Sequence, residues 1–410
     1  MNKYLLGTTA LATAGLIAGM AGGASAANQG DNRIKVGVHG YHQQWGVYAD
    51  QDIDSKATPG GASNRFKTNA VDQKHNSEIC FTGETTLDNG ITFGINVQLE
   101  ANSDPTPGSD STGDQIDESY LYIQSDSMGR LILGDENNAG YLLHVTAPDG
   151  GISIDSGDMV SDDFWQNLSG FSNFNTTLGT TNLRFGDNDS GKFTYISPRF
   201  AGFQLGASYI PQFEPGGGDD NDPIYKSRGT NTDDKETQNE GYAVGANFKE
   251  DFGGFGVQAS LGYLGANTSD NPLSAANGGA QFSFAGFTVG GAYVKAFGGS
   301  RTLNDNGQEI TEFDGDGWTA GGAYEIGPYK IGITYQRGVN SGFKGADGGD
   351  VRLDQANISG TYQFGPGIRL VGGFFAYDSD AQNPGCVTAD CGAGYNNDGW
   401  GFASGIKLGF

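Results

Sequence analysis

Hydrophobic and polar positions alternate along many short stretches of this chain. Between residues 91 and 99 the odd positions hold Ile, Phe, Ile, Val and Leu, and small or polar residues separate them. The segment 400–410 repeats the pattern and places on one face Trp400, Phe402, Ile406, Leu408 and Phe410. Further examples are 203–209, 242–248, 255–263 and 318–326. A period of two residues indicates β-strands that each have one apolar face.

The connections between these segments are of two kinds. Short turns fall at 87–90, 126–129, 198–202, 249–254, 284–287, 325–329 and 364–367. Long stretches rich in Asp, Asn, Gly and Ser fall at roughly 44–73, 101–114, 136–190, 210–238, 265–280, 298–314, 340–350 and 378–396. Seven short turns and eight long loops join sixteen strands, and segments of about ten residues can cross a bilayer when tilted. The pattern therefore predicts an all-β fold, a 16-stranded antiparallel transmembrane β-barrel.

Such a barrel must close, because an open sheet edge in lipid would leave backbone N–H and C=O groups without partners. We expect the segment 400–410 to pair with the first strand, residues 33 to about 43, whose Ile34, Val36 and Val38 share one face. Soluble all-β folds fit less well. The tandem repeats of a calcium-binding β-helix are absent, and a soluble sandwich does not require sixteen strands with long loops at one end.

The N-terminal residues predict export. Lys3 precedes an apolar Leu/Ala/Gly stretch and an A-x-A pattern at 24–26, so residues 1–26 have the form of a signal peptide and residues 27–410 would form the barrel. The 70 Gly, 25 Phe and 18 Tyr, with only 4 Met, suit strands better than helices. The formal net charge of −25 argues against nucleic-acid binding and favours attraction of cations.

Motifs for metals, cofactors and catalysis are weak. Cys386 and Cys391 lie in a loop-like segment and could form a disulfide in an oxidising compartment, whereas Cys80 falls within a strand pattern. The segment 186–192 begins like a phosphate-binding loop but continues with Phe instead of Ser or Thr. Acidic loop segments at 187–191 and 216–223 could hold Ca²⁺, although solvated loops account for them as well. No zinc spacing and no nucleophile-and-base set is recognisable, so we expect neither a cofactor nor an enzyme.

Three features carry a family resemblance. Residues 117–151 (DESYLYIQSDSMGRLILGDENNAGYLLHVTAPDGG), residues 192–211 (KFTYISPRFAGFQLGASYIP) and the aromatic Phe410 resemble the trimeric general porins of Gram-negative bacteria, especially the alphaproteobacterial branch. The resemblance implies a homotrimer in the outer membrane and a third loop folded into the barrel. It also implies that Phe410 belongs to the signal read by the barrel-assembly machinery. The apolar run 120–123 could lie at a subunit interface or face lipid.

The resemblance places the pore constriction in the loop 136–190. The acidic candidates there are Asp149, Asp155, Asp158, Asp162 and Asp163, and exposure to bulk water is an equally good interpretation for each one. Basic residues whose parity points into the lumen are Lys35, Lys192, Lys330, Arg369 and Lys407. Acidic groups at a constriction lower the energy of cations within a screening length of about 8 Å.

These patterns together predict a water-filled channel for passive diffusion of ions and small hydrophilic solutes, with a preference for cations. The alternative is a substrate-specific outer-membrane channel, for oligosaccharides or phosphate, on the same barrel. Trp45, Trp165 and Tyr141 are the candidate lumen aromatics that a sugar channel would use. A third hypothesis is a structural or adhesive barrel with a plugged lumen, which would pass no ions.

Overall fold

The computed structural model describes the chain in segments that together make up the barrel wall and part of its interior. These segments are residues 34–55, 69–101, 116–155, 157–159, 164–165, 177–185, 190–211, 213, 240–267, 273–297, 301–303, 309–311, 314–341, 350–381 and 395–410. The proposed signal peptide, residues 1–26, lies outside them, as do Asp162, Asp163, Cys386, Cys391 and the acidic segment 216–223.

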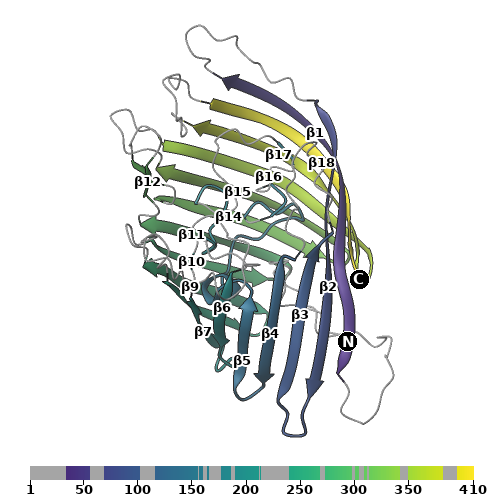
Figure 1. Cartoon of the computed structure of the whole chain (residues 1–410). Coiled ribbons are helices and arrows are strands. Elements are labelled where there is room, and N and C mark those ends of the chain that lie inside the picture. Colours follow the sequence, from purple (N-terminus) through teal and green to yellow (C-terminus); the bar gives the residue numbers. More distant parts are fainter. Residues whose placement is uncertain are drawn as a thin grey trace.

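Sixteen antiparallel strands form one closed barrel (Figure 1). In chain order they are β1 (Lys35–Ser55), β2 (Val71–Thr86), β3 (Thr92–Glu100), β4 (Glu118–Ser125), β5 (Gly129–Asp135), β6 (Gly191–Ile196), β7 (Phe203–Ile210), β8 (Glu240–Asp251), β9 (Phe255–Asn267), β10 (Leu273–Phe284), β11 (Phe287–Phe297), β14 (Gly315–Ile326), β15 (Tyr329–Ser341), β16 (Asp350–Gly365), β17 (Ile368–Ala381) and β18 (Tyr395–Gly409). A separate two-stranded sheet joins β12 (Arg301–Leu303) to β13 (Glu309–Thr311), and the one described α-helix is α1 (Ala139–Leu142). The predicted fold class and strand number are confirmed.

The last strand closes the barrel against the first. In Figure 1 the yellow β18 lies beside the purple β1, and in the register Phe402 stands opposite Tyr48. Beyond the strand, the backbone N–H of Phe410 donates to the Gly40 carbonyl over 3.1 Å, and the Gly40 N–H donates to the Phe410 carbonyl over 3.0 Å. The ladder is therefore complete, and no edge of the described barrel is left open in lipid.

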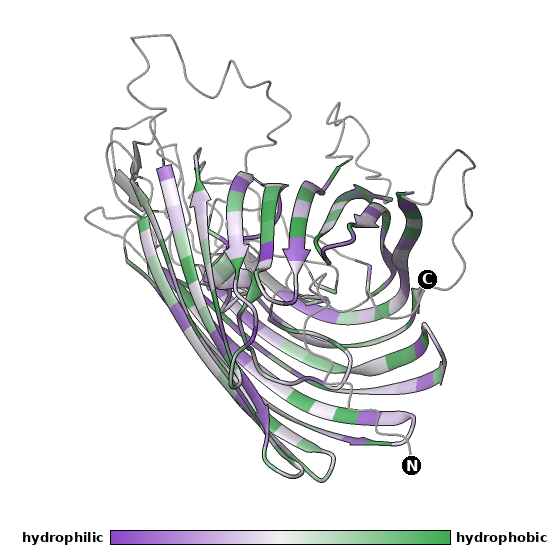
Figure 2. Cartoon of the chain, turned by 90° about the horizontal axis from the view of Figure 1, so that it is seen from below, coloured by the Kyte–Doolittle hydropathy of each residue, from purple (hydrophilic) through white to green (hydrophobic). Residues whose placement is uncertain are grey.

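Side chains alternate between the two faces of the wall, and the ribbons in Figure 2 change between green and purple along the strands. The outer face is apolar: Ile34, Phe374 and Trp400 are 64%, 59% and 50% exposed in the isolated chain. The inner face carries polar residues, among which Asn357 and Gln336 are buried. Soluble proteins bury their apolar side chains and expose their polar ones, and this barrel does the opposite. Such an arrangement is stable only where lipid acyl chains surround the outer face. Among the described residues there is no helix long and apolar enough to cross a membrane.

The predicted short turns all fall between paired strands, but three predicted loop boundaries were wrong. The strand β1 continues to Ser55 instead of ending near residue 43, because Trp45, Val47 and Ala49 continue the inward face. Only residues 268–272 separate β9 from β10, since the small residues of LSAANGGA at 273–280 form a strand without an apolar stripe. The predicted loop 298–314 contains the strands β12 and β13.

Candidate functional site in the barrel lumen

The connection between β5 and β6, residues 136–190, is called L3 here, and its described part lies inside the barrel. In Figure 1 the teal chain after β5 passes within the ring of strands. The N–H of Ala139 donates to Ser208 Oγ on β7 over 2.8 Å, and Asn247 Nδ2 on β8 donates to the Leu143 carbonyl over 3.0 Å. Further along, Asn357 Nδ2 on β16 donates to the Ile152 carbonyl over 3.1 Å. L3 therefore follows the inner side of the wall from β7 to β16 and narrows the lumen from that side.

A buried ion pair joins L3 to the last strand. Lys407 Nζ donates to both carboxylate oxygens of Asp158, over 3.0 and 2.8 Å, and their side chains are only 8% and 5% exposed. The ammonium lies 5.1 Å from the Trp45 ring centroid, and Ser153 also donates to Asp158 through its backbone N–H and its hydroxyl. We call Lys407, Asp158 and Trp45 the latch. This ion pair holds the loop against the wall, because detaching the loop would break both charge-assisted hydrogen bonds between Lys407 and Asp158.

Aromatic rings extend this attachment along the wall. Phe164 of L3 packs edge-on against Trp45 with centroids 5.1 Å apart, and Trp165 stacks on Tyr377 of β17 at 4.4 Å. Trp45 and Trp165 are 3% and 2% exposed. The two tryptophans named as lumen aromatics therefore lie between L3 and the wall. Their ring faces are already covered, whereas a sugar-binding slide requires open ring faces.

The other described acidic candidates of L3 also have partners within the structure. Asp149 lies 3.6 Å from Lys330 Nζ on β15 and accepts from the N–H of Gly151 over 2.7 Å. Asp155 accepts from the N–H of Thr181 over 2.8 Å and from the hydroxyls of three threonines, Thr146, Thr180 and Thr181. These contacts connect the two limbs of L3 to each other and to the wall. A constriction role for Asp149, Asp155, Asp158, Asp162 and Asp163 stays a prediction.

His144 lies where both limbs of L3 meet the wall. Its Nε2 is 3.0 Å from the Thr181 hydroxyl, and its Nδ1 is 3.0 Å from Asn277 Nδ2 on β10 and 3.4 Å from the Ser260 hydroxyl on β9. Burial lowers the pKa of His144 from 6.5 to about 4, and the negative charge of Asp155 opposes this shift only in part. The docked loop therefore holds a neutral imidazole at neutral pH.

We expect L3 to become more mobile as the pH falls from 6.5 towards 4. Between these pH values a detached, solvated His144 binds a proton, whereas the docked residue does not. Protonation therefore lowers the free energy of the detached loop relative to the docked loop, by on the order of 3 kcal/mol at pH 4. Single-channel current noise should rise between pH 7 and pH 4 in the unmodified protein and stay nearly flat in His144→Gln, whose amide can hydrogen-bond at the junction but does not titrate. Identical pH profiles of the two proteins would contradict this role.

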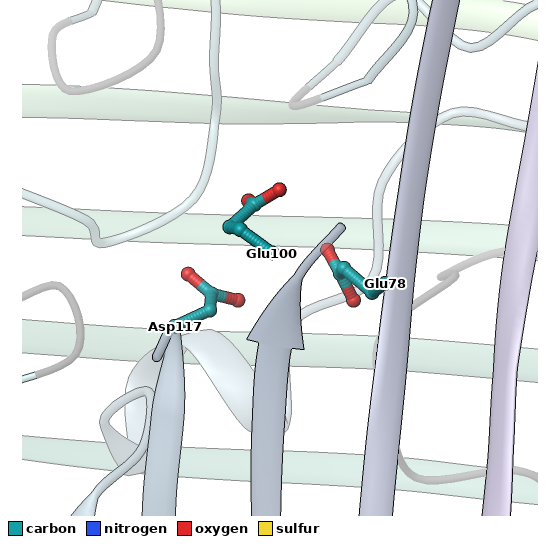
Figure 3. A group of neighbouring side chains, drawn as sticks. All are labelled: Glu78, Glu100 and Asp117. Atoms are coloured by element: carbon teal, nitrogen blue, oxygen red, sulfur yellow. The ribbon is translucent and has the colours of Figure 1, made fainter. Parts of the chain in front are cut away.

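Acidic side chains cluster on the inner face of the wall formed by β2, β3 and the start of β4 (Figure 3). The carboxylates of Glu78 on β2, Glu100 on β3 and Asp117 before β4 lie within 4.8 Å of one another. Tyr41 donates to Glu78 over 2.6 Å, and Gln98 Nε2 donates to Glu78 over 2.6 Å and to Asp117 over 3.0 Å. We call Glu78, Glu100 and Asp117 the wall acids. Arg184 of L3 interacts electrostatically with Glu78, so L3 presents a positive group towards this acidic wall.

Below the wall acids, towards the short turns, the same wall carries charges of both signs. Arg130 on β5 lies over the Tyr122 ring, 4.4 Å from its centroid, and Tyr122 donates to Glu84 over 3.1 Å. Glu84 stands opposite Lys35 in the register of β1 and β2. Tyr120 and Tyr122 are 7% and 3% exposed, so these two residues of the run 120–123 face the interior and cannot contribute to a subunit interface.

The predicted basic residues all have inward parity, but their surroundings differ. Lys35 is exposed, and Arg369 stands opposite Lys407 near the rim that carries the short turns. Lys330 pairs with Asp149, and Lys192 is 2% exposed and donates to the Ser190 carbonyl over 2.7 Å. The alternation along each strand therefore predicted correctly that these side chains point inwards. Whether their positive charge is accessible in the lumen depends on their contacts with L3.

Among the described lumen residues, the sequence pattern does not single out the wall acids, Arg130 or His144. A signal for Glu78 and Glu100 exists, since each continues the polar face of an alternating strand that was already recognised. Cys80 shares that face; it is a free thiol, 4% exposed, and its Sγ donates to Gln98 over 3.4 Å. Cys386 and Cys391 lie outside the described residues, so their disulfide stays a prediction.

A closed membrane barrel with a loop attached inside its lumen defines an outer-membrane channel protein. The sequence profile of the Gram-negative porin family matches residues 7–382, and the chain belongs to that family. It is accordingly a non-enzymatic channel of the Gram-negative outer membrane that passes small solutes.

Solved structures share this fold at low sequence identity. The anion-selective porin from Comamonas acidovorans is 15% identical, with a TM-score of 0.55 over 92% of this chain and 100% of that one. OmpF of Salmonella typhi, in complex with daunomycin, is 14% identical, with a TM-score of 0.55 over 92% and 98%. OmpT of Vibrio cholerae is 12% identical, with a TM-score of 0.54 over 93% and 99%. A search of curated protein sequences found no significant match.

Proposed function

We propose that this porin is a passive diffusion channel for ions and small hydrophilic solutes and that it prefers cations. The wall acids carry the proposal, because three carboxylates face the lumen within 4.8 Å of one another. A cation beside such a group gains about 1 kcal/mol at 4 Å in water, and screening limits the effect to about 8 Å at physiological salt. An anion at the same place is disfavoured by a similar amount.

Size selection in this proposal comes from L3, which occupies one side of the lumen. The latch and the aromatic contacts keep the loop against the wall, so the opening between L3 and the wall acids has a stable width. Solutes cross by diffusion through water, and no energy source is coupled to their movement. Two described acids of L3, Asp149 and Asp158, are paired with Lys330 and Lys407, so the proposal assigns the cation preference mainly to the wall acids.

Uptake of neutral sugars of graded size tests the diffusion mechanism. Liposomes that contain the protein should swell at rates that fall smoothly with sugar size, without saturation, because no site holds the solute. A substrate-specific channel would instead saturate, or would lose conductance on adding one particular oligosaccharide or phosphate at sub-millimolar concentration. The burial of Trp45 and Trp165 supports the diffusion channel, since neither ring face is open to a passing sugar.

We further propose that the protein is a homotrimer of the alphaproteobacterial general type, with a signal peptide at 1–26. The trimer is supported by the resemblance at 117–151 and by a solved OmpT of Vibrio cholerae, 14% identical, that is described as a trimer form. The apolar outer face would supply the contact between subunits. Electrophoresis without heating should show a band near three times the monomer mass that boiling removes. A single monomer band before and after boiling would contradict the trimer.

Phe410 is the residue that we propose as an assembly signal for the barrel-assembly machinery. Its backbone completes the ladder with Gly40, and the residue is 54% exposed. We expect deletion of Phe410 to lower the yield of heat-modifiable barrel several-fold, while the channels that do form keep normal conductance. Phe410→Tyr should assemble almost normally, because an aromatic ring is retained. A normal yield from the deletion variant would count against this role.

A further inference from the structure

Glycine and a hydroxyl residue face each other at three places on the inner wall beneath L3. The pairs, which we call stations, are Gly279 with Ser260, Gly321 with Thr334, and Gly332 with Ser359. In each pair the two residues stand directly opposite in the register of neighbouring strands. Both face L3, because the hydroxyls bond to it and a Cβ on each glycine would meet its backbone. L3 passes over all three stations in chain order.

The station at Gly321 shows what the two residues do. The Thr334 hydroxyl donates to the Pro148 carbonyl over 2.9 Å. The same carbonyl oxygen lies so near Gly321 that a Cβ there would approach it to less than 3.0 Å, a distance that real Cβ atoms do not reach. The hydroxyl therefore fixes where the loop backbone lies along the wall, and the glycine allows that backbone to approach the wall closely.

The other two stations repeat this arrangement. At Gly279, the Val145 N–H donates to Ser260 Oγ over 2.8 Å, and a Cβ on Gly279 would collide with the Val145 carbonyl. At Gly332, a Cβ would lie 2.5 Å from the backbone nitrogen of Gly150. Its partner Ser359 accepts from the Ile152 N–H over 3.3 Å. Three strand pairs, two of which share β15, thus hold successive parts of L3 in the same way.

We propose that these three stations set the path of L3 and thereby the aperture of the channel. A methyl group on a station glycine must keep about 3.5 Å from the loop backbone, so it would push that backbone by about 1 Å towards the pore axis. The wall glycines are then specificity-determining positions, although none of them contacts a solute. The inference rests on the proposed diffusion function, since it assumes that the opening beside L3 is the permeation path.

The test compares Gly321→Ala with Gly322→Ala, two adjacent residues of β14 that face opposite sides of the wall. A Cβ on Gly322 would lie 3.6 Å from Val289 Cγ1, an ordinary contact on the outer face. In planar bilayers we expect Gly321→Ala to lose some tens of per cent of the single-channel conductance and to exclude sugars that the unmodified protein admits. Gly322→Ala should match the unmodified protein. Unheated electrophoresis would first verify that both variants form barrels.

A second variant keeps the inference testable if Gly321→Ala does not assemble. Thr334→Val removes the hydroxyl at nearly constant volume, and we expect it to raise current noise while the mean conductance stays near normal. Equal or larger conductance in Gly321→Ala, or unchanged noise in Thr334→Val, would overturn the role of the stations. Absence of conductance in the unmodified protein would instead refute the diffusion function itself, so the two failures are distinguishable.

Discussion

Replacing Lys407 by Met should release the middle of L3, around Asp158, and give a noisier, wider channel. The substitution leaves Asp158 charged in a site where its side chain is only 5% exposed, and removing one partner of such a pair costs about 3–5 kcal/mol. The substitution raises the free energy of the docked loop, whereas a detached loop can expose the Asp158 carboxylate to water. A larger fraction of the loops should therefore be detached. Single-channel recording should show larger mean conductance and frequent fluctuations that the unmodified protein lacks.

Two further variants separate loss of the latch from general damage to the barrel. The double variant Lys407→Met with Asp158→Asn removes both charges and should restore quiet currents, because no buried charge is left unpaired. Lys330→Met breaks the pair with Asp149, whose side chain is 18% exposed, and should have a smaller effect because water partly screens that pair. Quiet currents in the single Lys407 variant would show that the aromatic contacts alone hold L3.

Neutralising the wall acids should lower the preference for cations. The triple variant Glu78→Gln, Glu100→Gln and Asp117→Asn replaces the three wall acids by neutral amides of nearly the same volume. Each charge contributes about 1 kcal/mol or less to a nearby ion, so the cation-to-anion permeability ratio should fall by roughly 3- to 10-fold at low salt. The reversal potential in a salt gradient measures this ratio directly. The difference should shrink as ionic strength rises, because screening reduces the field of the unmodified wall.

The chain offers a matched control with the same change in net charge. Asp52, Asp378 and Asp398 lie side by side on the outer face of β1, β17 and β18, in one row of the register. Changing all three to Asn removes three negative charges from outside the lumen. We expect the reversal potential to stay close to that of the unmodified protein. An equal shift from both triple variants would mean that total charge, and not the wall acids, sets the selectivity.

Most of the fold could be predicted from the sequence, because a barrel in lipid repeats one simple pattern. Segments such as 91–100 alternate clearly, and turn glycines such as Gly90 and Gly129, with φ of 80° and 78°, mark the short connections. The predicted strand boundaries were wrong where a strand does not alternate between large apolar and polar residues. In β10 the outward residues Ser274, Ala276 and Gly278 are small, so no apolar stripe identifies the strand.

The lumen was less predictable, because its chemistry depends on which parts of L3 meet which strands. Parity identified Lys330 and Lys407 as inward, but their pairing with Asp149 and Asp158 joins residues that are more than 150 positions apart. The wall acids come from β2, β3 and the residue before β4, which the strand register places together, although no local motif marks them. Glycines such as Gly321 carry no sequence signal that distinguishes a surface facing L3 from one facing lipid.

The most direct test of a cation-preferring diffusion channel is the reversal potential of residues 27–410 in a planar bilayer under a salt gradient. We expect discrete conductance steps and a reversal potential of the sign that cation selectivity produces. A reversal potential of the opposite sign, or a bilayer that remains silent although barrels are inserted, would contradict it.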